Sequence, residues 1–140
     1  MMDVKKLISY ALEARRKAYT PYSGFQVGAA LLDTDGKIYT GCNIENAAYT
    51  PSNCAERTAF FKAVSEGAYN FDAIAIVGGK EGHITDYCAP CGVCRQIMME
   101  FCSPDRFKII LAKKEDDYKE FTLGELLPMG FGPKDLTGRS

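Results

Sequence analysis

Two short stretches of the chain carry three cysteines and a glutamate at spacings that suit a metal site. Cys91 and Cys94 are three positions apart in "PCGVCRQ", so both thiolates can face one ion from the first turn of a helix. Cys54 in "NCAERTAFF" is the obvious third ligand. Three protein ligands are typical of a catalytic zinc site, which keeps a position open for water, whereas a structural site uses four. The pattern therefore favours a catalytic Zn²⁺ ion, one per chain.

Glu56 follows Cys54 by two positions. A regular helix turns by about 100° per residue, so the two side chains would point to nearly opposite sides if both lay deep inside one helix. We therefore expect Cys54 at the helix entrance, where the backbone is not yet helical, and a second helix entrance at Cys91. The free amide groups of both helix starts then stabilise thiolates. Glu56 is left as the catalytic acid and base, which takes a proton from the attacking water and delivers it to the substrate.

Arg57 comes directly after this glutamate and is the nearest cation in the sequence. Three thiolates outweigh the charge of one Zn²⁺ ion, and the excess negative charge makes a water bound there harder to deprotonate. We expect Arg57 to compensate part of this charge by a hydrogen bond to a ligand sulfur.

Length and composition limit the classes of protein that are possible. The chain has 140 residues and is 46% hydrophobic, which predicts a single domain over residues 1–140. Its formal net charge of -1 offers no bulk attraction to nucleic acid or to anionic lipid. No signal peptide or membrane span is recognisable, so we expect a cytoplasmic protein that binds neither membranes nor nucleic acid. In that compartment the six cysteines act as ligands, nucleophiles or core residues rather than in disulfides.

The remaining pattern predicts the elements that must position these residues. The run "FDAIAIVGG" is apolar throughout, as expected for a central strand that helices cover on both faces. We expect a first helix from Asp3 to near "TPYSG", whose "RRK" end is solvated, and then a hairpin over 25–45 that turns at Asp35-Gly36. A second helix should run over 54–67, and a third should begin at Pro90 and bury Val93, Ile97, Met98 and Phe101. Strands at "FKIILA" and "YKEFTL" and a short helix at "GELLP" should follow. Their sum is an α/β domain of three layers, α/β/α, with about five strands and at least three helices.

"CAE" followed by "PCGVCRQ" resembles the cytidine deaminases, in the version with three cysteine ligands. The likeness continues through "PYSGFQVGAALL", "GCNIENAAYT" and "ELLP", and so covers nearly the whole chain. It implies a mixed five-stranded sheet flanked by helices and the short, homotetrameric kind of enzyme. The implied reaction is zinc-dependent hydrolysis of cytidine or deoxycytidine to uridine or deoxyuridine with release of ammonia, as in pyrimidine salvage.

The resemblance also assigns roles to individual residues. It makes Cys54, Cys91 and Cys94 the zinc ligands and Glu56 the proton shuttle. Asn43 and Glu45 match a pair that binds the ribose hydroxyls, and they alternate on an expected strand, so both side chains point the same way. The remaining substrate-binding positions implied by the resemblance are Phe25 against the pyrimidine, and Ala47, Tyr49, Ala55 and Phe131 around the pocket, partly across a subunit boundary.

Other interpretations remain open at this level. The metal could be purely structural in a binding module, with Cys88 as a fourth ligand. Cys88, Cys91 and Cys94 together have the spacing of an iron–sulfur run, but such a run would want a fourth cysteine followed by proline, and Met98 and Met99 stand there instead. A thioredoxin-like pair would leave Cys54 and Glu56 unexplained. A nucleoside antibiotic such as blasticidin S would need a different pocket from "CNIENAAY", and a base in RNA or DNA would need a basic groove.

Overall fold

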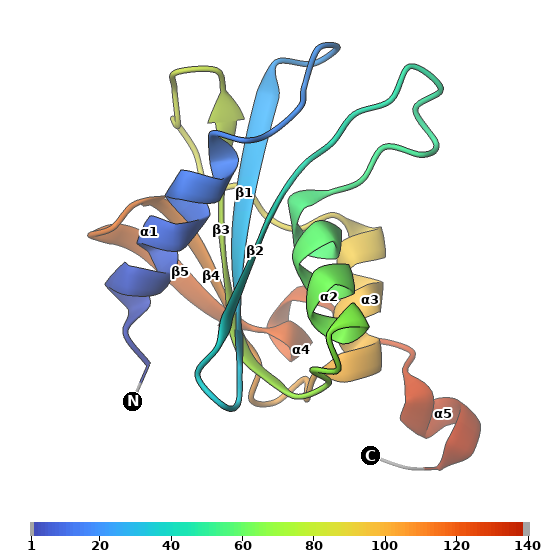
Figure 1. Cartoon of the computed structure of the whole chain (residues 1–140). Helices are drawn as coiled ribbons and strands as arrows, with labels where there is room; N and C mark the ends of the chain where they lie inside the picture. Colours follow the sequence, from blue (N-terminus) through green and yellow to red (C-terminus); the bar gives the residue numbers. More distant parts are fainter. Residues whose placement is uncertain (1, 139–140) are drawn as a thin grey trace.

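The computed structural model describes residues 2–138, which form a mixed five-stranded sheet with helices on both faces (Figure 1). The strands are β1 (Phe25–Asp33), β2 (Ile38–Cys42), β3 (Phe71–Lys80), β4 (Lys108–Lys114) and β5 (Asp117–Thr122). The helices are α1 (Val4–Arg15), α2 (Ala55–Ser65), α3 (Gly92–Phe101), α4 (Leu123–Leu126) and α5 (Pro133–Thr137). No helix in this part of the chain is long and apolar enough to cross a bilayer. The expected α/β/α architecture with five strands is confirmed.

The strand order is β2-β1-β3-β4-β5, with β3 and β4 parallel and the other neighbours antiparallel. β1 and β2 form the expected hairpin, because the Asp33 carboxylate accepts hydrogen bonds from the backbone N–H of Asp35 and Lys37 and Gly36 takes a φ of 91°. The parallel pair needs a long connection. This connection carries α3 and the loop before it, and so brings the second cysteine stretch to the side of the sheet where α2 lies (Figure 1).

Two hydrophobic cores lie on the two faces of the sheet. α1 covers one face, and α2 and α3 cover the other (Figure 1). β3 contributes to both cores, because successive side chains of a strand point to opposite faces. Ala73, Ala75 and Val77 belong to the core under α1, whereas Ile74 and Ile76 belong to the core under α2 and α3. The prediction that this strand is covered on both faces is therefore confirmed.

Two glycines allow the helices to lie directly on the strands. A Cβ atom at Gly41 of β2 would lie 2.4 Å from the carbonyl oxygen of Ala55 in the first turn of α2. A Cβ atom at Gly28 of β1 would lie 2.0 Å from the carbonyl oxygen of Ala11 in α1. Both distances are far below van der Waals contact, so glycine is required for this close approach. Gly41 thereby fixes the start of α2, where the first cysteine and the glutamate of the motif lie.

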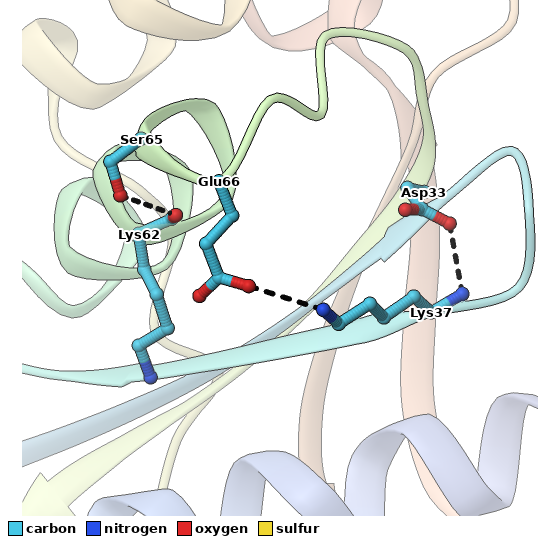
Figure 2. A network of polar contacts seen from close by, with 5 residues as sticks. All are labelled: Asp33, Lys37, Lys62, Ser65 and Glu66. Carbon is cyan, nitrogen blue, oxygen red and sulfur yellow. Dashed lines mark hydrogen bonds and ion pairs between the residues drawn. The ribbon is translucent and has the colours of Figure 1, made fainter.

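Exposed polar contacts fasten the β1–β2 hairpin to the end of α2 (Figure 2). Lys37 Nζ lies 3.1 Å from Glu66 Oε1, and Lys62 donates a hydrogen bond to the carbonyl oxygen of Thr40. Because both partners of the ion pair are exposed to solvent, its contribution to stability is small.

The first helix differs from the prediction at its C-terminal end. α1 ends at Arg15, several residues before "TPYSG". Arg16 and Lys17 are exposed, as expected of a solvated end, but Arg15 is only partly exposed. Its guanidinium donates hydrogen bonds to the carbonyl oxygens of Gln26, Gly79 and Lys80, at the ends of β1 and β3.

The buried face of α3 also differs from the predicted stripe. Val93 is 56% exposed, whereas Cys94 and Met98 are buried. The buried face of α3 therefore includes the thiol of Cys94, which the predicted stripe of apolar residues left out. Pro90 precedes this helix, which begins at Gly92, and the short helix α5 near the C-terminus was not predicted.

Candidate active site

Two of the three motif cysteines occupy the residue that precedes a helix. Cys54 is the N-cap of α2, with φ -77° and ψ 154°, and Cys91 is the N-cap of α3, with φ -69° and ψ 168°. Both are extended, so their side chains do not follow the helical direction of the next residues. Cys94 comes from the first turn of α3. The expectation of two helix entrances at Cys54 and Cys91 is confirmed.

The three sulfur atoms are arranged as a zinc site requires. The Sγ atoms of Cys54 and Cys91 are 3.7 Å apart, those of Cys91 and Cys94 are 3.5 Å apart, and all three lie within 4.8 Å of one another. A tetrahedral zinc ion with Zn–S bonds of about 2.3 Å separates its sulfur ligands by about 3.8 Å. The sulfurs therefore fit this ion. Cys88 does not belong to the group, which is the one candidate cluster of three or more ligands among residues 2–138.

The surroundings of the cluster favour thiolate at Cys54. A hydrogen bond with Cys94 lowers the pKa of Cys54 to about 5, and contacts with Arg57 and Cys91 add to this effect. The Arg57 Nη2 atom lies 3.2 Å from Cys54 Sγ, and this contact raises the pKa of the guanidinium. The expected contact between Arg57 and a motif sulfur is thus present. The Nε atom of Arg57 is buried without a hydrogen-bond partner among the described residues.

Glu56 is one residue inside α2 and only 4% exposed. Burial raises the pKa of its carboxyl to about 7. A carboxyl group in this state can accept and donate a proton near neutral pH, which is what a general acid and base must do. The sequence placed this side chain beside the cysteines, and the structure brings the four residues of the motif together.

A cavity of about 440 Å³ opens in front of Glu56 and the cysteines. This volume lies in the range of small-molecule sites. Eight of the predicted site residues line it: Asn43, Glu45, Tyr49, Cys54, Ala55, Glu56, Arg57 and Cys91. A larger cavity of about 910 Å³ lies between the end of α3 and the C-terminal segment, but none of the predicted site residues lines it.

Asn43 and Glu45 do not lie on a strand, which corrects the prediction. β2 ends at Cys42, and the backbone then turns to pair with Tyr19, whose N–H donates to the Asn43 carbonyl oxygen. The Asn43 backbone N–H still donates to the Val27 carbonyl oxygen of β1 at 3.3 Å, and the Asn43 side chain adds two further hydrogen bonds to this strand. Its Nδ2 donates to the Phe25 carbonyl oxygen at 2.8 Å, and its Oδ1 accepts from the Val27 N–H at 2.9 Å. Both residues nevertheless line the cavity.

Phe25, Ala47 and Phe131 are not among the residues that line the cavity, whereas Tyr49 is. Phe25 begins β1 and is 38% exposed, and Ala47 is exposed in the loop that also holds Tyr49. Tyr49 has a φ of 61° and is 72% exposed, and its ring meets the Tyr22 ring edge-on with centroids 6.3 Å apart. Phe131 is 56% exposed and does not line the cavity of its own chain, since its carbonyl oxygen is bound by Gln96 of α3.

Cys88 and Ser23 lie in or beside the site, although neither belongs to the predicted substrate-binding residues. Cys88 lines the cavity, and burial raises the pKa of its thiol to about 11. A Cβ atom at Gly78 would lie 2.8 Å from Cys88 Sγ and 3.2 Å from the Phe25 ring, so this glycine makes room for both side chains. Ser23 binds the carboxylate of Glu45. The only signal for Ser23 in the sequence is its place in "PYSG", a turn sequence in which a serine side chain can bind nearby backbone.

Comparisons with known proteins agree with this geometry. The family described as "Cytidine and deoxycytidylate deaminase zinc-binding region" matches residues 1–110. A cytidine deaminase from Sporosarcina psychrophila is 52% identical over 97% of this chain and 96% of its own, and one from Halalkalibacterium halodurans is 50% identical over 96% and 98%. The crystal structure of cytidine deaminase from Burkholderia pseudomallei is 47% identical, with a TM-score of 0.83 over 93% of this chain and all of that one. The chain therefore belongs to the cytidine and deoxycytidylate deaminase family and is a zinc-dependent hydrolase.

Proposed function

We propose that the protein hydrolyses the exocyclic amine of cytidine and deoxycytidine, giving uridine or deoxyuridine and ammonia, as a step of pyrimidine salvage. One observation carries this proposal: a buried carboxyl group and a zinc-shaped set of three sulfurs meet at the inner end of a cavity with polar groups at its mouth. The cavity volume of about 440 Å³ suits a single nucleoside rather than a polynucleotide.

Cys54, Cys91 and Cys94 would hold the zinc ion, whose chemistry here is Lewis acidity that makes water a nucleophile at neutral pH. Glu56 then accepts the proton of the attacking water. The same carboxyl delivers this proton to N3 of the pyrimidine. It then takes the second proton, from the hydroxyl group now bonded to C4, and delivers it to the departing amine as the C4–N bond breaks, since one residue can carry these transfers in turn. Arg57 offsets the charge of the thiolates through its contact with Cys54 Sγ.

The residues at the mouth of the cavity would bind the nucleoside. Asn43 and Glu45 hold the ribose hydroxyls, and Phe25 packs against the pyrimidine, with Ala47, Tyr49 and Ala55 completing the wall. The positions of Asn43 and Glu45 are fixed by hydrogen bonds to the start of β1 and to the turn before it, which supports this role. A rigid site loses less conformational entropy when the nucleoside binds.

We further propose that the functional unit is a homotetramer of single-domain chains in the cytoplasm. Phe131 is exposed on a segment that does not line its own cavity, and Tyr49, Met129 and Leu136 are exposed as well. Phe131 could then contact the pocket of a neighbouring subunit. Thiol ligands require a reducing compartment, which supports the cytoplasmic location. Sedimentation at several concentrations, with activity measured on the same samples, tests whether dilution separates the chains and lowers turnover.

The variant Glu56→Gln tests the reaction itself. It should keep its fold and one zinc per chain but lose cytidine turnover by about 10³-fold, because general acid and base catalysis typically contributes about 10²–10⁴. Turnover is followed by loss of cytidine absorbance and confirmed by release of ammonia. Glu66→Gln is the matched control, since the side chain of this exposed glutamate at the end of the same helix pairs with Lys37 (Figure 2), away from the cavity, and the variant should keep full activity. A folded, zinc-loaded wild-type protein without turnover of either nucleoside would refute the proposal.

A further inference from the structure

Ser23 lies in the turn between α1 and β1 and joins two segments of the proposed nucleoside site. Its hydroxyl donates a hydrogen bond to Oε2 of Glu45, which follows β2. The same hydroxyl oxygen accepts the N–H of Phe25 at 3.0 Å. Ser23 therefore connects the carboxylate proposed to bind the ribose with the first residue of β1, whose ring is proposed to pack on the pyrimidine.

The carboxylate of Glu45 is largely occupied by this turn. Its Oε1 accepts the N–H groups of Tyr22 at 3.0 Å and Ser23 at 3.1 Å, and its Oε2 accepts the Ser23 hydroxyl. A carboxylate has about four lone-pair sites, so three protein donors leave about one site free. The Ser23 hydroxyl is the one side-chain donor of the three, and among the described residues it is the donor that binds Oε2. This hydroxyl determines how the remaining acceptor site is oriented toward the cavity.

The turn itself is held from a second direction. Lys80, at the end of β3, donates from Nζ to the Ser23 carbonyl oxygen at 2.8 Å. The hydrogen bond from the Ser23 hydroxyl is the main cause of a lowered pKa of the Glu45 carboxyl, and the Lys80 ammonium adds to this effect. Ser23 is thus fixed by its backbone to β3, while its side chain fixes Glu45.

We propose that Ser23 is a positioning residue that sets the Glu45 carboxylate against the ribose and links it to Phe25. This inference rests on the proposed function, because it assumes that the cavity binds a nucleoside. It assigns to the "PYSG" turn a role in ribose recognition, although Ser23 does not itself line the cavity. The substrate class that depends on Ser23 is the pyrimidine nucleoside with a free sugar hydroxyl.

Steady-state kinetics on two substrates test the inference. Ser23→Ala should raise KM for cytidine about tenfold and leave kcat nearly unchanged, since the lost contact acts on binding rather than on the reacting atoms. The same comparison on 2′,3′-dideoxycytidine, which lacks the 2′- and 3′-hydroxyl groups, should show an increase in KM that is at least threefold smaller, because this substrate offers Glu45 no 2′- or 3′-hydroxyl to bind. Ser23→Thr keeps the hydroxyl and should restore the wild-type KM. Ser65→Ala, which removes an exposed serine hydroxyl at the end of α2 (Figure 2), should change neither constant.

The substrate comparison separates positioning from a general structural role. If Ser23→Ala raises KM equally for both substrates, or for neither, the inference is overturned while the deaminase activity of the wild type still stands. If the wild type turns over neither substrate, the proposed function fails instead. A second measurement does not depend on turnover: carboxyl-carbon NMR should show that the pKa of Glu45 rises in Ser23→Ala, and an unchanged pKa would overturn the inference.

Discussion

Replacing Gly41 by alanine should damage the site from a distance, because this glycine is where β2 touches the first turns of α2. A Cβ atom at position 41 would lie 2.4 Å from the Ala55 carbonyl oxygen and 2.6 Å from the Ala59 backbone nitrogen. Both are backbone atoms, so no side-chain rotation can relieve the contact. The helix as a whole must move, and Glu56 and Cys54 move with it.

The size of the effect follows from these distances. Real Cβ atoms keep at least 3.0 Å from such neighbours, so α2 has to shift by about 0.6 Å or more. Overpacking of this kind typically costs about 1–3 kcal/mol. For a chain of this length the unfolding entropy is about 0.3 kcal/mol per kelvin, so a cost of about 2 kcal/mol lowers Tm by about 7 °C. Because a 1 Å misplacement of a reacting group can cost about 10²-fold, kcat should fall about tenfold.

Thermal unfolding and cytidine turnover measured on the same zinc-loaded preparation give both numbers. Gly124→Ala is the matched control. Its Cβ atom would lie 3.2 Å from the Pro104 carbonyl oxygen, a contact that small adjustments relieve. Gly124 does not line the 440 Å³ cavity. The control variant should change Tm by less than about 2 °C and leave kcat intact. Gly41→Ala with wild-type Tm and kcat would refute the argument. A lower Tm with full kcat would show that the site does not depend on the position of α2.

Three further changes have defined outcomes. Arg57→Ala should speed the transfer of zinc to a chromophoric chelator by about tenfold, because it removes the cation at 3.2 Å from Cys54 Sγ; an unchanged rate would show that the contact does not retain the metal. Arg15→Met should lower the free energy of unfolding by about 2 kcal/mol through its lost bonds to strand carbonyl groups, whereas Arg16→Met, at an exposed side chain, should have little effect in the same denaturant titration. Removing zinc should speed hydrogen exchange of the first amides of α2 and α3 but not that of Lys6, whose N–H the Asp3 side chain caps; equal protection with and without zinc would contradict this.

The metal cluster could be predicted from the sequence because its geometry is local. Two side chains two positions apart can reach one point only if the first precedes the helix, and the N-cap conformation of Cys54 agrees with this argument. The pair Cys91 and Cys94 needs only the three-residue spacing of a helix start. The alternation of β3 between two cores follows in the same way from an uninterrupted apolar run.

The segment after β2 could not be predicted, because its course depends on contacts distant in the sequence. Alternation alone extends the strand through Glu45, but β2 ends at Cys42, the last backbone bond to β1 comes from the Asn43 N–H, and Ile44 pairs with Tyr19 instead. The side-chain amide of Asn43 binds the Phe25 carbonyl oxygen and the Val27 N–H, and nothing in its residue type distinguishes this use from a solvent-facing strand position.

Arg15 and Ser23 were missed for a related reason. Their partners are carbonyl groups at strand ends and a carboxylate more than twenty positions away, whose free acceptor sites exist only once the sheet has formed. The expected solvation of this helix end holds for Arg16 and Lys17, whereas Arg15 is partly buried against strand carbonyl groups. Polar residues that link separate segments of the chain are therefore the hardest part of such a site to predict from sequence patterns.

The starts of α2 and α3 lack the side-chain caps found at other helices of this fold, and their cap positions hold cysteines of the candidate site instead. Asp3 and Thr122 cap α1 and α4 with side-chain hydrogen bonds, whereas neither Cys54 nor Cys91 makes such a bond to its helix. A missing side-chain cap costs about 1 kcal/mol per helix. In return, both thiol groups are free to meet at one point, with the unpaired amide groups and positive ends of two helices near their sulfurs. The same feature that weakens α2 and α3 as isolated helices thus favours thiolates where the metal must bind.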